Sequence, residues 1–196
     1  SLTACGNTGS NTSSASGGSS VSTSAGGSNA GASLPEITAG SCQTPAILTS
    51  IGQSADVDIV STLCSKAGLE VQTNATLSAD DLTADCKTLI LAVGGSSKGL
   101  GAAGIDEAQE LERTNALLAK ADELGITVLA MHTGGSARRG TLSDAFIKPA
   151  FEAADIAIVV SEGDGDGLMS GILANNNTPS AYVAQAADCL ATLKTL

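Results

Sequence analysis

Short apolar segments alternate with segments of helical periodicity from residue 46 to residue 193. Thr88 to Val93 (TLILAV) and Ile156 to Val160 (IAIVV) are apolar throughout, without the alternation of a half-exposed strand. Continuous apolar strands are typical of a parallel sheet covered on both faces. We expect strands over residues 46–50, 69–71, 88–93, 126–131, 156–160 and 181–183.

The segments between these strands carry apolar residues at spacings of three and four, which predicts amphipathic helices. Ser54 is expected to cap the first helix and Gly68 to end it, while Asp106 and Gln109 form a capping-box pattern for a helix to Leu124. Further helices are expected over residues 143–153, up to about 174, and over 186–193. The alternation predicts an α/β fold: a three-layer, doubly wound, mainly parallel sheet, either flavodoxin-like or Rossmann-like.

The N-terminal segment has a different composition. Residues 6–34 are almost entirely Gly, Ser, Asn, Thr and Ala, with Val21 the only large apolar residue before Leu34. Such a segment cannot bury enough surface to fold, so we expect a disordered tether. We therefore divide the chain into a lipoprotein-type N-terminus and tether over residues 1–43 and a single α/β domain over residues 44–196.

The tether follows the sequence Leu2-Thr3-Ala4-Cys5, which has the form of a bacterial lipoprotein processing site. We expect lipidation at Cys5, a membrane partner reached through that lipid, and an extracytoplasmic, membrane-anchored or cell-surface location. The alternative is that Cys5 is an ordinary cysteine in a tail. No apolar run approaches the roughly 20 residues of a membrane helix.

The amino-acid composition argues against several classes of function. With two Phe, one Tyr, no Trp and a net charge of −11, the chain is poorly suited to bind nucleic acid. A single histidine argues against a Cys/His zinc site. Outside the cytoplasm, the four remaining cysteines predict either disulfides or buried free thiols: Cys42, Cys64, Cys86 and Cys189.

The long polar loops all follow strand ends. They span residues 52–56, 94–101, 132–140 and 161–167, whereas the opposite loops are minimal. The carboxyl ends of parallel strands form the ligand-binding edge of doubly wound folds. We therefore predict that this edge is the functional face.

Three of the nine basic residues, Lys98, Arg138 and Arg139, fall on this edge and suggest binding of a small anion. Alternatively, the two arginines pair with surface acids. The predicted ligand-binding residues are Gln53, Ser54, Ser96, Ser97, Lys98, His132, Gly135, Ser136, Arg138 and Arg139.

Other chemistries have weaker signals. A hydrolase or transferase would use His132 as a base with Ser136, Ser96 or Ser54 as the nucleophile. A structural role, with self-assembly into an array or filament, is a third alternative.

The sequence also carries patterns that resemble metal and cofactor sites. Glu162, Asp164 and Asp166 are weak calcium candidates, because their loop is not an EF-hand. The G-x-G-x-x-G of Gly99 to Gly104 lies too far beyond its strand for a dinucleotide fingerprint, so we expect no cofactor.

Three blocks carry a family resemblance: Ile47 to Asp56 (ILTSIGQSAD), Gly94 to Asp106 (GGSSKGLGAAGID) and Met131 to Gly140 (MHTGGSARRG). Together they resemble an uncharacterised bacterial family, the domain of unknown function 6305, over roughly residues 44–196. The resemblance implies a bacterial, often exported, α/β domain. It implies no particular activity.

Overall fold

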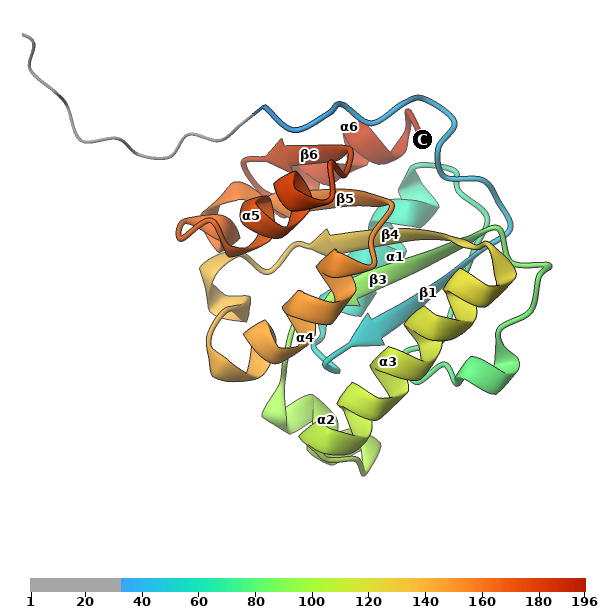
Figure 1. Cartoon of the computed structure of the whole chain (residues 1–196), viewed down its shortest axis with the longest axis vertical. Helices are drawn as coiled ribbons and strands as arrows, with labels where there is room; N and C mark the ends of the chain where they lie inside the picture. Colours follow the sequence, from blue (N-terminus) through green and yellow to red (C-terminus); the bar gives the residue numbers. More distant parts are fainter. Residues whose placement is uncertain (1–32) are drawn as a thin grey trace, which may run out of the picture. The chain divides into compact units, whose positions relative to one another are not determined.

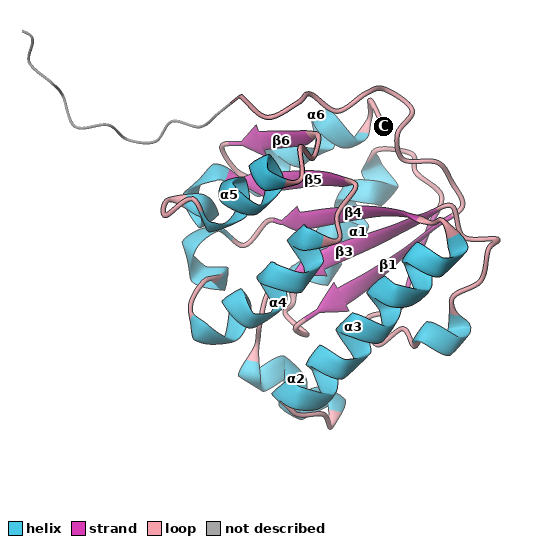
Figure 2. Ribbon diagram, viewed as in Figure 1, coloured by secondary structure: helices cyan, strands magenta, loops and turns pink. Residues whose placement is uncertain are grey.

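Six strands form one sheet in which every neighbouring pair is parallel, in a computed structural model that describes residues 33–196. Figure 2 shows the strand arrows pointing in one direction. The order β2-β1-β3-β4-β5-β6 is flavodoxin-like and extends that pattern by one strand. The strands are Ala46–Ile51 (β1), Val71–Thr73 (β2), Thr88–Val93 (β3), Thr127–His132 (β4), Ile156–Val160 (β5) and Ser180–Val183 (β6).

Helices cover both faces of this sheet and make three layers. Helices α3, α4 and α5 lie in front of the sheet in Figure 1, and α1 and α6 lie behind it. The helices are Asp56–Lys66 (α1), Ser97–Ala103 (α2), Glu107–Leu124 (α3), Thr141–Glu152 (α4), Leu168–Asn175 (α5) and Cys189–Leu193 (α6). Short 3-10 turns are Ala79–Asp81 (η1), Gly135–Arg138 (η2), Ser161–Asp164 (η3) and Ala186–Asp188 (η4).

Alternate residues of β3 supply the two cores between these layers. Leu89 and Leu91 belong to the cluster beneath α3 and α4, whereas Ile90 and Ala92 belong to the cluster beneath α1 and α6. All six residues of β3 are buried, as expected for a strand without a polar face. Full burial of one such aliphatic side chain contributes about 1.5–3 kcal/mol. The prediction of a doubly wound parallel sheet is therefore confirmed.

Most predicted elements agree closely with the structure. The bounds of β3 and β5 are those expected, and α3 begins with the predicted capping box. In that box Gln109 N–H donates to Oδ1 of Asp106 over 2.7 Å, and Asp106 N–H donates to Oε1 of Gln109 over 2.9 Å. Pro149 lies within α4, as expected.

Three local predictions were wrong. Residues 97–103 form helix α2, although we expected a loop there. Helix α1 begins at Asp56 with Ala55 at the cap position, one residue later than predicted; Ser54 precedes it, and its hydroxyl accepts the N–H of Asp56 over 3.4 Å and donates to the side chain of Asp56. Strand β2 lies two residues later than predicted, over Val71–Thr73.

Residues 33–43 run along the domain before β1. The carbonyl of Pro35 accepts a hydrogen bond from the N–H of Ser180 on β6 over 2.9 Å. Leu34 packs against one core cluster and Ile37 against the other. We call residues 33–43 the strap. The predicted lipidation site Cys5, and the tether as far as residue 32, lie outside the described residues.

The four cysteines of the described part, Cys42, Cys64, Cys86 and Cys189, are buried and free. The sequence left both disulfides and buried free thiols open, and in the structure the four cysteines are free thiols. Within residues 33–196 no helix is both long enough and apolar enough to cross a membrane.

Candidate functional site

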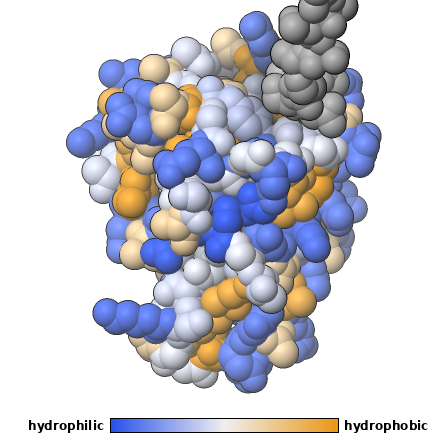
Figure 3. All heavy atoms as spheres, turned by 90° about the vertical axis from the view of Figure 1, so that its left-hand side faces the viewer, coloured by the Kyte–Doolittle hydropathy of each residue, from blue (hydrophilic) through white to orange (hydrophobic). Residues whose placement is uncertain are grey.

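The candidate site lies where β1 and β3 end side by side. From this point the chain enters α1 on one face of the sheet and α2 and α3 on the other, so the two loops diverge. Such a topological switch is where doubly wound folds bind ligands. Figure 3 views this edge directly and shows a mainly hydrophilic surface with separate apolar patches.

Glycines let the two diverging loops approach closely. Gly52 has φ of 101°, and a side chain on it would collide with the carbonyl of Gly94. The N–H of Gly94 donates to Ile51, and that of Ser96 donates to Gly52, each over 2.9 Å. Only a residue without Cβ satisfies both the positive φ and the close contact. These glycines therefore let the loops after β1 and β3 pack directly against each other at the base of the edge.

Asp56 organises the centre of this edge from the start of α1. It is buried, and its Oδ2 accepts the hydroxyl of Ser54 over 3.0 Å. The same oxygen accepts Nε–H of Arg138 over 3.2 Å, across 82 positions of sequence. Two predicted residues from different loops, Ser54 and Arg138, are thereby brought together by an aspartate that was not among the predicted ligand-binding residues.

Arg138 and Arg139 have different surroundings. In Arg139, Nε and both terminal nitrogens donate hydrogen bonds to Asp144, Asp166 and the carbonyl of Gly163. These hydrogen bonds raise the pKa of Arg139 above its ordinary value. Arg138 uses only Nε, and its two terminal nitrogens form no hydrogen bond with the rest of residues 33–196. Both arginines thus form ion pairs, Arg139 with Asp144 and Asp166 at the surface and Arg138 with buried Asp56, and only Arg139 has all of its nitrogens occupied.

His132 ends β4 and is fully buried beneath the η2 turn. Its Nε2 lies 2.8 Å from the carbonyl oxygen of Arg138, and Nδ1 has no hydrogen-bond partner in the described part of the chain. Burial lowers the pKa of His132 below its ordinary value. No serine hydroxyl of residues 33–196 is hydrogen-bonded to the ring, and Ser136 instead donates to Oε1 of Glu162 over 2.8 Å. The His132–serine arrangement required for a hydrolase is therefore not formed here.

The loop after β5 separates its three carboxylates. Asp164 accepts the N–H groups of Met169 and Ser170 and the hydroxyl of Tyr182, while Asp166 pairs with Arg139. The hydroxyl of Tyr182 donates over 2.7 Å, and burial raises its pKa. Glu162 faces the η2 turn instead. No group of three acids, cysteines or histidines within residues 33–196 is arranged to hold a metal ion.

The residues predicted in the loop after β3 form no hydrogen bond or ion pair with Arg138 within residues 33–196. Ser96 caps α2 by accepting the N–H of Gly99 over 3.0 Å. Ser97 and Lys98 are exposed, and neither side chain forms a hydrogen bond or ion pair within the described residues. Lys98 is thus available on the same edge without belonging to the Asp56–Arg138 group.

Sequence reasoning missed a buried polar group next to this site. Glu110 is fully buried, and its Oε2 accepts the N–H of Gly52 over 3.0 Å and Nε2–H of Gln53 over 2.8 Å. Arg113 bonds to the same carboxylate and reaches Thr49 and the carbonyl of Leu77. The predicted ligand residue Gln53, at φ of 62°, is therefore held by the protein itself. The spacing of Glu110 and Arg113 on one helix face was the available signal.

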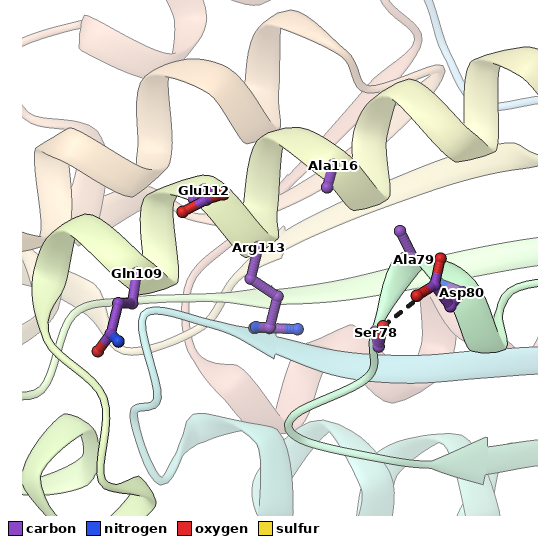
Figure 4. A pocket seen from close by; sticks show the side chains of 7 residues that line it. All are labelled: Ser78, Ala79, Asp80, Gln109, Glu112, Arg113 and Ala116. Carbon is purple, nitrogen blue, oxygen red and sulfur yellow. Dashed lines mark hydrogen bonds between the residues drawn. The ribbon is translucent and has the colours of Figure 1, made fainter.

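A shallow depression of about 340 Å³ lies between α3 and η1, away from the strand ends. Figure 4 shows its lining, with Arg113 extending from α3 toward β1. Each nitrogen of the Arg113 guanidinium already has a protein acceptor. The depression therefore offers no unpaired cation, and the charged groups left open in it are the exposed carboxylates of Asp80 and Glu112, which form no ion pair within residues 33–196. It is lined by Ser78, Ala79, Asp80, Gln109, Glu112, Arg113 and Ala116.

Comparison with known families supports the resemblance. The model of DUF6305, a domain of unknown function, matches residues 43–196. The chain belongs to the DUF6305 family. No curated protein matches the DUF6305 chain.

Solved structures similar to this DUF6305 domain include two mutant forms of the esterase AlinE4, 10% and 8% identical in sequence. Each match covers 76% of this chain and 81% of the esterase chain, with a TM-score of 0.30. This similarity is too low to transfer an activity to the DUF6305 domain.

The DUF6305 site presents one guanidinium, that of Arg138, in an orientation held by a hydrogen bond at the carboxyl edge of the sheet. Asp56 fixes Nε of Arg138, and the side chain of Arg138 is 29% exposed. Its terminal nitrogens can donate two parallel hydrogen bonds, the geometry that matches a carboxylate or phosphate.

Proposed function

We propose that the DUF6305 domain binds a small solute carrying an anionic group at the carboxyl edge of its sheet, with Arg138 as the principal contact. The observation that supports this most directly is the single-sided use of the Arg138 guanidinium, bonded through Nε to buried Asp56. A buried carboxylate that orients an arginine leaves its outer edge ready for a ligand.

The neighbouring Arg139 does not share this role. All three of its nitrogens are bonded to Asp144, Asp166 or Gly163, so a ligand would have to displace existing bonds. Truncation of one arginine should therefore affect binding far more than truncation of the other. This asymmetry separates ligand binding from a general effect of positive charge.

The proposal is tested by isothermal titration with acetate, propionate and inorganic phosphate, after a thermal-shift screen of the same compounds. Arg138→Ala should weaken binding roughly 30-fold, equivalent to about 2 kcal/mol, at the low end for a charge-assisted contact because Arg138 is partly exposed. Lys120→Ala, a partly exposed basic residue on α3 that pairs with Glu123, should leave binding unchanged. The proposal would be rejected if none of the three compounds binds, or if Arg138→Ala and Lys120→Ala weaken binding equally.

We further propose that the domain is carried on a membrane surface by a lipid at Cys5, outside the cytoplasm. The support is the Leu2-Thr3-Ala4-Cys5 sequence followed by a Gly/Ser-rich segment. Cys5→Ser should move the protein from the membrane pellet to the soluble fraction of its bacterial host. Retention of the variant in the pellet would show that another feature anchors the protein.

A further inference from the structure

An acidic side chain lies beside Arg138 on the same turn. A methyl group built on Gly134 would overlap the side chain of Arg138, and one built on Gly135 would lie 3.3 Å from Oε2 of Glu162. The guanidinium-bearing chain and the Glu162 carboxylate therefore cover two consecutive residues. Arg138 is the last residue of that turn, and Glu162 comes from the loop after β5.

The two side chains lie over consecutive residues of the turn, and their charges are not paired with each other. Arg138 bonds to Asp56, and Oε1 of Glu162 accepts the hydroxyl of Ser136 over 2.8 Å. Within residues 33–196, Oε2 of Glu162 accepts no hydrogen bond, and no ion pair joins Glu162 to Arg138. A positive and a negative group thus remain available at neighbouring positions.

We infer that the ligand is a small zwitterion of the amino-acid class, with a carboxylate and a protonated amine separated by one or two carbon atoms. The inference rests on the proposed function, because it assigns the ligand carboxylate to the terminal nitrogens of Arg138. The ligand ammonium then faces Oε2 of Glu162. A planar carboxylate matches the end of the guanidinium, and an ammonium group supplies the donor that this glutamate lacks.

The charge of the edge favours the same class of ligand. The loops of this edge hold four acids and three basic residues, and Asp144 of α4, which pairs with Arg139, brings the net charge to −2. A dianion such as phosphate is repelled by that surplus, whereas a zwitterion has no net charge. The acids are Asp56, Asp144, Glu162, Asp164 and Asp166, and the bases are Lys98, Arg138 and Arg139.

Compounds with a matched carbon skeleton test this assignment. L-Alanine, propionate and ethylamine share a two-carbon unit and differ in which charged groups they carry, and β-alanine moves the amine one carbon further away. Isothermal titration should show L-alanine or β-alanine binding at least roughly tenfold more tightly than propionate, with ethylamine weaker still. Glu162→Gln should reduce zwitterion affinity to the propionate level and leave propionate affinity unchanged.

Two further variants separate the possible outcomes. Arg138→Ala should weaken binding of both the zwitterion and propionate roughly 30-fold, while Glu123→Gln, an exposed acid on α3, should change neither. If propionate binds as tightly as the alanines, or if Glu162→Gln does not change the affinity for the alanines, the zwitterion inference fails and the proposed anion site stands. If no carboxylate binds, both fail.

Discussion

Glu110 on α3 accepts a hydrogen bond from the backbone N–H of Gly52, at the end of β1, over 3.0 Å. The same oxygen accepts Nε2–H of Gln53, and Arg113, one turn along the helix, bonds to this carboxylate. Because Glu110 is fully buried, the only groups that can satisfy its charge are those of the protein. Ser54 and Asp56 follow directly in the chain, so Glu110 holds the start of the loop that supplies the candidate site.

Removal of this carboxylate should be costly. Glu110→Ala leaves Arg113 mostly buried without its ionic partner and Gly52 without an acceptor, which typically costs about 3–5 kcal/mol. Urea unfolding measures the loss, with Glu123→Ala on the exposed part of the same helix as the matched control. A loss below about 1 kcal/mol for Glu110→Ala would contradict the arrangement.

The Arg139 group should give the domain an acid-dependent stability. Hydrogen bonding from Arg139 lowers the pKa of Asp166 to about 2, and lowers that of Asp144 as well. An unfolded aspartate titrates near 3.9, so the stabilisation is complete above about pH 4 and is lost as the pH falls toward 2. The difference in Tm between the parent protein and Asp166→Asn should therefore shrink over that interval.

Asp85 provides the comparison for this experiment, because it is exposed and belongs to no ion pair of residues 33–196. Asp85→Asn should differ little from the parent protein at any pH. A constant Tm difference for Asp166→Asn between pH 6 and pH 2 would show that the aspartate acts through packing and not through its charge.

The buried cysteines should not react with a thiol reagent until the domain unfolds. Burial raises the pKa of Cys64 and of Cys189 to about 11, so little thiolate is present at pH 8. In a Cys5→Ser background, Ellman's reagent should find no reactive thiol in the native protein and four after addition of guanidinium. Two or none in unreduced, denatured protein would reveal disulfides.

Truncations should separate the strap from the residues before it. Deletion of residues 1–32 should change Tm by about 2 °C or less, because the only large apolar residues it removes are Leu2 and Val21. Deletion of residues 1–43 also removes Leu34, Ile37 and buried Cys42, and should lower Tm by roughly 6–12 °C, equivalent to about 3 kcal/mol. Differential scanning calorimetry checks both, and equal Tm values would show that the strap does not stabilise the domain.

The layered fold could be predicted because a strand that buries both faces is apolar at every position. That pattern can be recognised within a single short segment such as Thr88 to Val93. Helix α2 escaped prediction because Gly99 and Gly101 disfavour an isolated helix. Its formation depends on burial of Leu100 and on the cap from Ser96, and the first of these is a tertiary effect.

The position of the candidate site could also be predicted, because loops after parallel strands share an edge, but the roles of its residues could not. Asp56 and Arg138 are 82 positions apart, and Glu110 and Gly52 are 58 apart. Sequence spacing carries no information about which of two adjacent arginines meets a distant aspartate. For the same reason Gln53 was predicted to face a ligand, whereas its side chain bonds to Glu110 and to the carbonyl of Ala75.

The strap also determines how these domains behave when they are crowded together. An exposed edge strand presents unpaired amide groups onto which a strand from another molecule can add, the usual first step of aggregation. At β6 the N–H of Ser180 is already taken by Pro35, and a proline has no N–H of its own to offer to a further strand. Neighbouring copies at high local density therefore meet a sheet edge that is closed to strand addition at this point.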